Sequence, residues 1–355
     1  MVTSLFIDEF IESIDNSVLI DVRSEGEYEQ GHFPGSINLP LLNNHEREIV
    51  GTIYKQEGKI AAVQKGFELV GGKFHTYIEK AKSLAQLNRI YVYCWRGGMR
   101  SNIMAWLLST AGCEVFILKD GYKSFRSTVL DGINQQRNFI ILGGKTGSGK
   151  TQMLHLFKSF GAQVIDLEFL ANHRGSAFGG IGQGKQPSNE QFENELYLLL
   201  RNMKAHDPIW LENESRLIGK IKIPDLLFEQ MRCANVIELL VPIESRARRI
   251  VNEYGGLPKE QLAEATRAIE RKLGNLRMKQ ALEHLDQNEW MDWAILLLHY
   301  YDSFYEYGLT QRSSESVRRV DVATSDMMKE AEAIFKEFKA GMKSESSIKF
   351  NDGKD

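Results

Sequence analysis

The first residues able to do chemistry form a short loop around Cys94. The loop reads CWRGGMRS (94–101) and lies between an apolar stretch typical of a buried strand and one with helical spacing. Its two glycines let the backbone turn around the sulfur, and the free amides at a helix start favour negative charge there. Arg96 and Arg100 add positive charge nearby, which favours the thiolate. The pattern predicts Cys94 as a nucleophile able to accept sulfur or selenium, in an anion pocket with Arg96 and Arg100.

The other two cysteines predict no chemistry. Cys113 and Cys233 lie in apolar surroundings, and the three cysteines are far apart with no paired spacing. This spacing argues against a disulfide framework and against a zinc site. A reducing compartment is therefore expected, and we predict a cytoplasmic protein. No membrane span is predicted, since the longest apolar run has six residues.

A second group of residues matches a phosphate-binding loop. The segment 144–151 reads GKTGSGKT, follows the apolar stretch FIILG and precedes the helical run MLHLF. In this context the glycines let backbone amides converge on phosphate oxygens, while the lysine neutralises charge and the threonine can ligate Mg²⁺. The predicted phosphate-binding residues are Gly144, Gly147, Ser148, Gly149, Lys150 and Thr151. Mg²⁺ at Thr151 is the metal expected, and no tightly bound cofactor is predicted.

Acidic and basic residues farther along could complete this second site. Asp166 and Glu212 follow apolar strands, where acids of this kind of fold hold metal-bound water or act as bases. The glycine-rich segment 173–196 predicts a mobile loop over the site. Its Arg174, together with Arg216 after the strand that carries Glu212, is a candidate substrate or metal contact. Solvated strand-end acids and surface ion pairs remain the alternative for these residues.

The elements that position both sites follow an α/β rhythm. The chain has 355 residues, more than one hydrophobic core usually serves. Strand-like and helix-like stretches alternate from residue 18 to 121, the polar segment INQQRN (133–138) follows, and the alternation then resumes. We predict a first domain over residues 1–134 and a second, parallel-sheet domain over residues 135–355, with a helical C-terminal part.

Charge is balanced over the whole chain but not locally. The net charge is −3, which excludes a uniformly basic nucleic-acid binder. Residues 241–280, however, hold nine Lys and Arg against five Asp and Glu, and an aromatic stretch (290–307) follows. This basic stretch is expected to meet phosphates, whereas helical aromatics are more typical of a core. The candidate contacts are Arg246, Arg248, Arg249, Arg271 and Lys272.

Two motifs together resemble a known domain. The segment VLIDVRSEGEYEQGHFPGSINLP (18–40) precedes the cysteine loop, and the pair is similar to a rhodanese domain. In that family the loop cysteine carries sulfane sulfur or its analogue. The resemblance implies a rhodanese-like fold for the first domain, with Asp21 and Arg23 bracing it.

A rhodanese-like domain joined to this phosphate loop resembles the bacterial tRNA 2-selenouridine synthases. The segments that carry the resemblance are CWRGGMRS (94–101), VGTIYKQEGK (50–59), GGKTGSGKT (143–151), NHRGSAFG (172–179), ENESRLIG (212–219) and YYDSFYEYGL (300–309). The resemblance implies a P-loop NTPase-like second domain and a transferase that modifies the wobble 2-thiouridine of tRNA. It also implies geranyl diphosphate and selenophosphate as substrates, with S-geranylation before sulfur is replaced by selenium at C2.

Within this scheme we expect Lys150 and Thr151 to serve geranyl transfer, and Cys94 with Arg96 and Arg100 to serve the selenium step. Spacing does not decide whether the cysteine carries selenium or only polarises the donor; of the two, a transient persulfide-like adduct is expected. The basic residues of 241–280 become candidate tRNA contacts. Two alternatives remain: an ATP-dependent tRNA sulfurtransferase, and a non-catalytic regulator that responds to nucleotide.

Overall fold

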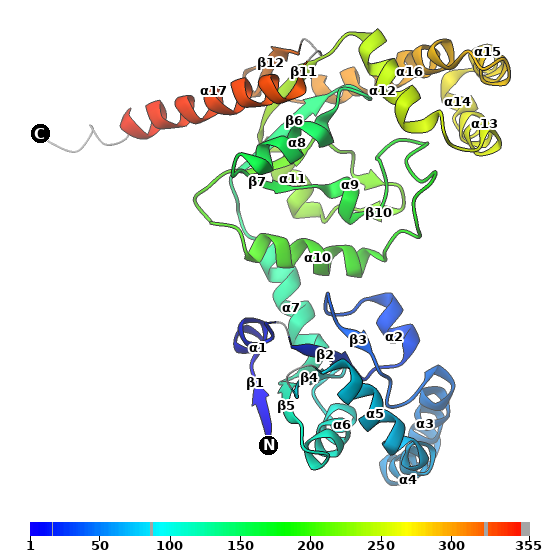
Figure 1. Cartoon of the computed structure of the whole chain (residues 1–355), viewed down its shortest axis with the longest axis vertical. Coiled ribbons are helices and arrows are strands. Elements are labelled where there is room, and N and C mark those ends of the chain that lie inside the picture. Colours follow the sequence, from blue (N-terminus) through cyan, green and yellow to red (C-terminus); the bar gives the residue numbers. More distant parts are fainter. Residues whose placement is uncertain (16, 86–87, 323–325, 349–355) are drawn as a thin grey trace, which may run out of the picture. The chain divides into compact units, whose positions relative to one another are not determined.

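The computed structural model describes residues 1–15, 17–85, 88–322 and 326–348, and the chain divides into two compact units (Figure 1). The first unit comprises residues 1–133 with 188–201, and the second comprises 134–187 with the chain from 202 onward. The division after Ile133 lies one residue from the expected boundary. The segment 188–201 was expected in the second domain, but it forms helix α10 (Asn189–Arg201), which packs against helix α7 of the first unit.

The first unit is built on a parallel sheet. Its strand order is β1-β5-β4-β2-β3, and every pairing is parallel. The strands are β1 (Val2–Leu5), β2 (Val18–Asp21), β3 (Ile37–Asn38), β4 (Arg89–Tyr93) and β5 (Glu114–Leu118). Side chains alternate between the faces of β4: Ile90 and Val92 join an aliphatic core, whereas Tyr91 and Tyr93 join aromatic neighbours.

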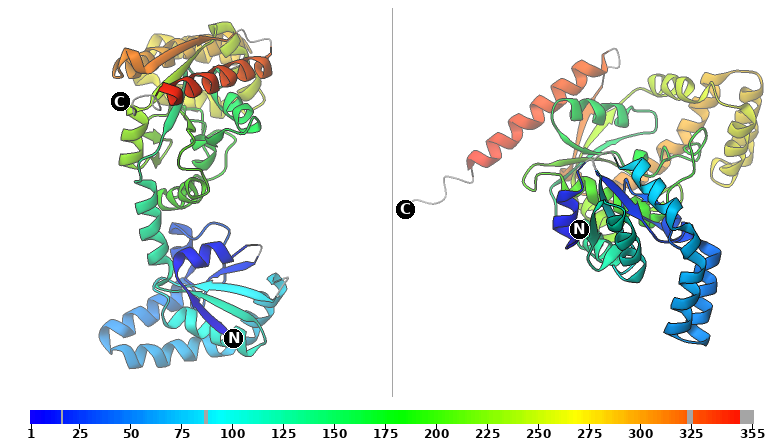
Figure 2. Two further views of the ribbon diagram at one scale, coloured as in Figure 1. Left: turned by 90° about the vertical axis from the view of Figure 1, so that its left-hand side faces the viewer. Right: turned by 60° about the horizontal axis from the view of Figure 1, so that its bottom comes forward.

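Helices cover both faces of this sheet. They are α1 (Ile7–Ser13), α2 (Glu25–Gln30), α3 (Asn44–Gln56), α4 (Lys59–Val70), α5 (Phe74–Leu84), α6 (Met99–Thr110) and α7 (Gly121–Ile133), with a short 3₁₀ turn η1 (Gly71–Lys73). Helix α3 begins at a capping box. The Asn43 side chain accepts a hydrogen bond from the Glu46 amide, and the Glu46 carboxylate accepts one from the Asn43 amide. Helices α3 and α4 pair as a hairpin that projects from the rest of the unit (Figure 2).

The second unit is built on another parallel sheet, in the order β12-β11-β6-β8-β7. The strands are β6 (Phe139–Gly144), β7 (Gln163–Ile165), β8 (Ile209–Glu212), β11 (Asn235–Leu240) and β12 (Val317–Asp321), and a small antiparallel pair joins β9 (Leu217–Ile218) to β10 (Ile221–Lys222). Every residue of β6 is buried, as expected for the central strand of a sheet covered on both faces.

The helices of this unit include one group that gathers beside the sheet. Those associated with the sheet are α8 (Lys150–Ser159), α9 (Leu167–Leu170), α11 (Asp225–Cys233) and α17 (Met327–Ile348). The group at the side comprises α12 (Ile243–Tyr254), α13 (Lys259–Ala268), α14 (Glu270–Leu273), α15 (Asn275–Asp286) and α16 (Trp290–Thr310), followed by the 3₁₀ turn η2 (Ser314–Ser316) (Figure 1). Helices α12 and α15 both pack on α16 around a common core.

The α/β class predicted from the sequence is confirmed. Both sheets are parallel, and the later part of the second unit is mostly helical. Over the described residues, no helix is both long enough and apolar enough to cross a membrane.

Candidate functional site

The cysteine loop joins β4 to α6, as the sequence predicts. Its shape depends on contact with the turn before α7, where the Tyr122 amide donates to the Cys94 carbonyl oxygen (2.8 Å) and the Lys123 amide to that of Trp95 (3.0 Å). Gly97 and Gly121 both have positive φ, at 61° and 62°. A Cβ added at Gly121 would lie 2.3 Å from the Cys94 carbonyl oxygen, so only glycine fits there.

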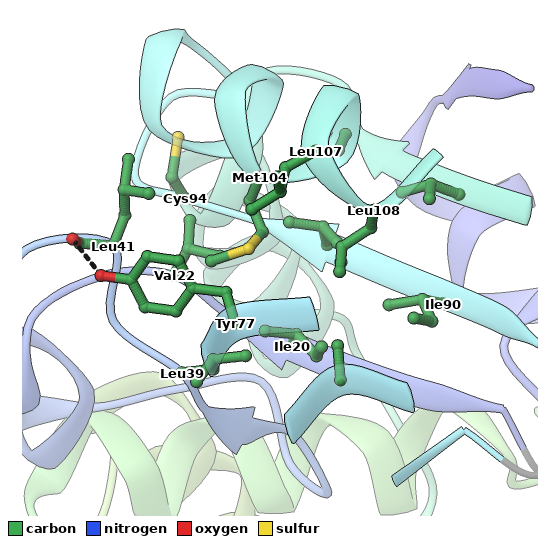
Figure 3. Close-up of a cluster of buried hydrophobic side chains, with 14 of the residues drawn as sticks. Ile20, Val22, Leu39, Leu41, Tyr77, Ile90, Cys94, Met104, Leu107 and Leu108 are labelled. Carbon is green, nitrogen blue, oxygen red and sulfur yellow. Dashed lines mark hydrogen bonds between the residues drawn. The ribbon is translucent and has the colours of Figure 1, made fainter. Parts of the chain in front are cut away.

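The side chain of Cys94 is buried. Cys94 is 3% exposed and belongs to the border of the aliphatic core, near Met104 and Leu41 (Figure 3). Its Sγ lies 3.2 Å from the Ser101 hydroxyl oxygen, and the same hydroxyl is within donating distance of the Gly98 carbonyl (3.0 Å). Ser101 can therefore give its one proton to a thiolate, a partner that the sequence motif contained but that we did not single out.

The two arginines of the loop have different surroundings. Arg100 makes a bidentate ion pair with Glu27 (2.6 and 3.2 Å), and Arg47 also pairs with that carboxylate. Burial alone would raise the pKa of Glu27, but the hydrogen bond and charge of Arg100 outweigh it and hold that pKa below its usual value. Arg96 is exposed. Of the two predicted anion ligands, Arg96 is the one whose charge is not already offset by a carboxylate within the described residues.

A buried ion pair supports the turn that contacts this loop. Arg23 and Asp21 are both almost fully buried and share hydrogen bonds of 2.7–3.1 Å, and Arg23 also donates to the Gly31 carbonyl. The Arg23 guanidinium lies over the Tyr122 ring, 3.9 Å from its centroid. Because Tyr122 follows Gly121, this pair fixes the turn on which the cysteine loop rests, in agreement with the bracing role expected for it.

The phosphate loop joins β6 to α8, again as the sequence predicts. Gly147 and Gly149 have positive φ, at 78° and 86°, so both positions need glycine. The Lys150 ammonium donates to the Gly144 carbonyl (3.1 Å), and the Ser148 hydroxyl is buried with no hydrogen-bond partner among the residues that the structure describes. A buried hydroxyl without a partner is costly, and a bound phosphate oxygen would satisfy it.

Helix α12 holds this loop from the other side. Arg249 donates to the carbonyls of Gly147 (3.2 Å) and Ser148 (2.7 Å). Arg246 is 4% exposed, pairs with Asp302 through two bonds (2.8 and 2.7 Å), and reaches the Thr146 carbonyl. These two candidate tRNA contacts therefore brace the phosphate loop, and the charge of Arg246 is offset by Asp302. The remaining candidates Arg248, Arg271 and Lys272 are exposed.

Buried acids surround Thr151. Its hydroxyl donates to Glu212 (2.8 Å) and lies 3.4 Å from Glu168. Burial, and then repulsion from neighbouring acids, raises the pKa of Glu212 to about 8, and the same causes raise the pKa of Glu168 to about 8. Oxygen ligands of this kind fit Mg²⁺, which usually combines few protein ligands with substrate phosphates. Thr151, Glu212 and Glu168 would hold the ion next to the phosphate loop.

The structure brings only some of the other predicted residues to this site. Asp166 accepts from the Phe169 amide at the start of α9 and pairs with His155 (2.8 Å), so Glu168 takes the place beside Thr151. Arg216 is exposed and pairs with Asp225, whereas Arg174 pairs with Glu253 (2.8 Å) and lines the same cavity as the phosphate loop. The loop expected over 173–196 ends where α10 begins at Asn189.

The phosphate loop opens into a cavity of about 630 Å³. Lys150, Thr151, Glu168 and Arg174 form its polar end. Its apolar wall comprises Phe178, Ile250, Tyr254, Trp293, Leu297, Tyr301 and Tyr305. The last four recur every four residues along one face of α16, and the Tyr305 hydroxyl accepts from the Gly144 amide (2.6 Å). Trp293 and Leu297 belong to the core around α12, α15 and α16, as the sequence suggested for these helical aromatics. The sequence did not show that the same face also borders the phosphate loop.

Known protein families match both units. A rhodanese-like domain matches residues 7–128, and the tRNA 2-selenouridine synthase AAA domain matches residues 137–333. A tRNA 2-selenouridine synthase of Shewanella frigidimarina is 36% identical over 346 residues, which cover 87% of this chain and 93% of the relative. The chain belongs to the tRNA 2-selenouridine synthase family. The resemblance found in the sequence, including a rhodanese-like unit followed by a P-loop-like unit, is thereby confirmed.

Further similarities involve shorter parts of the chain. A tRNA 2-selenouridine synthase of Nitrosomonas europaea is 38% identical over 249 residues, which cover 68% of this chain and 64% of the relative. Among solved structures, the N-terminal domain of a Clostridium difficile 630 protein is 43% identical and covers 36% of this chain and 99% of its own, with a TM-score of 0.35.

Proposed function

We propose that this member of the tRNA 2-selenouridine synthase family replaces sulfur by selenium at C2 of the wobble 2-thiouridine of tRNA. The reaction has two steps: S-geranylation with geranyl diphosphate, then exchange of the geranylthio group for selenium from selenophosphate. The observation that carries the proposal is the cavity of the second unit. It joins a diphosphate cradle to a wall of aromatic and aliphatic side chains, and a prenyl diphosphate has these same two parts.

The first step follows from that cavity. The thiouridine sulfur attacks C1 of the geranyl group, a C–S bond forms, and the C–O bond breaks with its electron pair going to diphosphate. The proton on N3 of the base passes to solvent or to a carboxylate of the cavity. Loop amides, Lys150 and the Mg²⁺ ion would stabilise the departing diphosphate. Tyr301, which lines the cavity, could stabilise positive charge on the allylic carbon.

The second step needs no oxidant, because selenium has the same oxidation state in selenophosphate as in selenouridine. We place the Cys94 thiolate at phosphorus. An S–P bond forms, the P–Se bond breaks, and hydrogenselenide leaves; water later hydrolyses the thiophosphate to phosphate and restores Cys94. Hydrogenselenide adds to C2, and the geranylthio group leaves as a thiolate that takes up a proton. A selenium–sulfur adduct on Cys94 would instead require an oxidant or the release of phosphite.

Mass analysis of tRNA nucleosides tests the proposal. Thiolated tRNA is incubated with geranyl diphosphate, with selenophosphate, and with both. We expect geranylated base with the first donor and selenouridine with both. Lys150→Ala should prevent geranylation, whereas Cys94→Ala should geranylate normally and accumulate the geranylated base. Normal selenouridine from Cys94→Ala would contradict the assignment of that residue.

A competition experiment separates this proposal from the ATP-dependent alternative. If the aromatic wall holds a prenyl chain, geranyl diphosphate should displace ATP from the second unit, and inorganic diphosphate should bind more weakly than geranyl diphosphate. Coupling of ATP hydrolysis to sulfur transfer, without any geranylated base, would favour the sulfurtransferase.

A further inference from the structure

A second cavity lies in the first unit, beside the cysteine loop. It has a volume of about 360 Å³, within the range of small-molecule pockets. Helices α3, α4 and α6 line it, with an apolar interior that includes Leu42, Val50, Val63, Phe67, Met99 and Ile103. Nothing in the two proposed reaction steps has so far used this cavity.

The cavity shares residues with the surroundings of Cys94. Met99 and Arg100 line the cavity and also begin the helix that follows the cysteine loop. Leu41 and Val70 line it and belong to the same buried cluster as Cys94. The cavity and Cys94 thus border the same buried cluster, and the first residues of α6 belong to the cavity lining.

Its walls are apolar but incompletely covered. Phe67 is 46% exposed and Met99 is 47% exposed, although both line a concave surface. Three cationic side chains, Arg47, Lys59 and Arg100, lie on the lining as well. Arg47 and Arg100 are both paired with Glu27, so the cavity offers mainly an apolar surface, which suits a ligand with a hydrocarbon part.

We propose that this cavity binds the prenyl chain of the S-prenylated base during the selenium step. The inference rests on the proposed function, in which the base reaches the cysteine loop with a hydrocarbon chain on the sulfur to be displaced. The hydrocarbon chain is more stable out of water, so its binding site must lie within one chain length of the cysteine loop. The apolar interior receives the chain. The bound chain thereby aligns C2 with the selenium donor.

Two glycines allow the cavity to be filled without disturbing the fold. Gly51 in α3 and Gly66 in α4 line the cavity, and a Cβ at either position meets no atom within 4 Å. Leucine also favours a helix more than glycine does. Gly51→Leu and Gly66→Leu should therefore fold normally. Gly72→Leu is the matched control, because Gly72 also has free space around it but does not line the cavity.

The test measures each reaction step separately on the full-length chain. Gly51→Leu and Gly66→Leu should geranylate thiolated tRNA at the normal rate, but KM for conversion of geranylated tRNA should rise about tenfold or more. Conversion of tRNA carrying an S-methyl group, which has no chain to bind, should change little. Gly72→Leu should match the unmodified protein. Normal KM for geranylated tRNA in both cavity variants would overturn the proposal.

A binding measurement keeps the cavity testable if the proposed function itself fails. The probe is the nucleoside S-geranyl-2-thiouridine, titrated into the Cys94→Ala protein so that no reaction follows. Adding Gly51→Leu to the Cys94→Ala protein should weaken nucleoside binding about tenfold. Adding Gly72→Leu instead should leave the binding unchanged. Absence of geranylation by the unmodified protein would contradict the proposed function, whereas nucleoside binding insensitive to Gly51→Leu would contradict the cavity assignment.

Discussion

At the scale of single residues, the acids around Thr151 show how the protonation of the phosphate site would respond to a bound cation. Glu212 is fully buried, and Glu168 and Glu214 lie close enough for their charges to repel. Burial is the largest cause of the raised pKa of each, and Lys150 opposes it only in part. Without a cation, the folded protein therefore favours protonated carboxyl groups here, whereas Mg²⁺ would favour the ionised groups.

This arrangement predicts a pH dependence of stability. The pKa of Glu212 is about 8 in the folded chain, against about 4.3 for an exposed glutamate. Between these values the unfolded chain releases a proton that the folded chain retains. The contribution of Glu212 to the free energy of unfolding is therefore fully present below about pH 4.3 and is lost as pH rises through 8. In the absence of Mg²⁺, the unfolding temperature of the second unit should fall over this range.

The variant Glu212→Gln isolates the contribution of this carboxyl group. Glutamine cannot ionise but can still accept from Thr151, so the fall in unfolding temperature between pH 5 and pH 8 should be smaller than in the unmodified protein. Calorimetry at a series of pH values, without Mg²⁺, provides the comparison. An equal slope in both proteins would show that Glu212 does not titrate in this window.

At the scale of elements, the cysteine loop depends on the turn that begins α7. Alanine at Gly121 would place its Cβ 2.4 Å from the Gly97 amide nitrogen as well as against Cys94, and its φ of 62° disfavours any side chain. We expect Gly121→Ala to lower the rate of the selenium step by at least about tenfold while geranylation is retained. The measurement is the rate of each step on purified thiolated and geranylated tRNA.

Gly98 supplies the control for this prediction. It lies in the same loop, but its φ is −98° and a Cβ there meets no atom within 4 Å. Gly98→Ala should keep nearly normal rates of both steps. Equal losses in the two variants would mean that the loop tolerates no side chain at either glycine, and that the contact with Gly121 has no special role.

The elements also show what sequence can and cannot predict. The strands that carry Cys94 and the phosphate loop were recognisable, because both are apolar stretches followed by a glycine turn and a helix, and such signals are local. Residues 188–201 were expected in the second domain, partly as a loop, but they form α10 of the first unit, because the partner α7 lies more than fifty residues earlier in the chain. The aromatics of α16 were correctly expected in a core, but their helical spacing did not show that one face of the helix also borders a cavity.

At the scale of the whole molecule, each proposed site is complete within one unit. The residues around Cys94 and its neighbouring cavity all belong to the first unit, and those of the phosphate loop and its cavity to the second. The proposed chemistry has the same division: in the proposal, the first step forms a carbon–sulfur bond and releases diphosphate, and the second step replaces that sulfur by selenium. The geranylated tRNA is the only species that both sites must handle.

This division predicts complementation between two inactive proteins. Lys150→Ala retains an intact cysteine site, and Cys94→Ala retains an intact phosphate site, so neither alone should make selenouridine from thiolated tRNA. A mixture of the two should make it, because geranylated tRNA released by Cys94→Ala is a substrate for Lys150→Ala. The double variant Lys150→Ala/Cys94→Ala mixed with either single variant is the control and should remain inactive. If each single variant performs its own step but the mixture yields no selenouridine, the tRNA must stay on one chain throughout, and the two sites do not work independently.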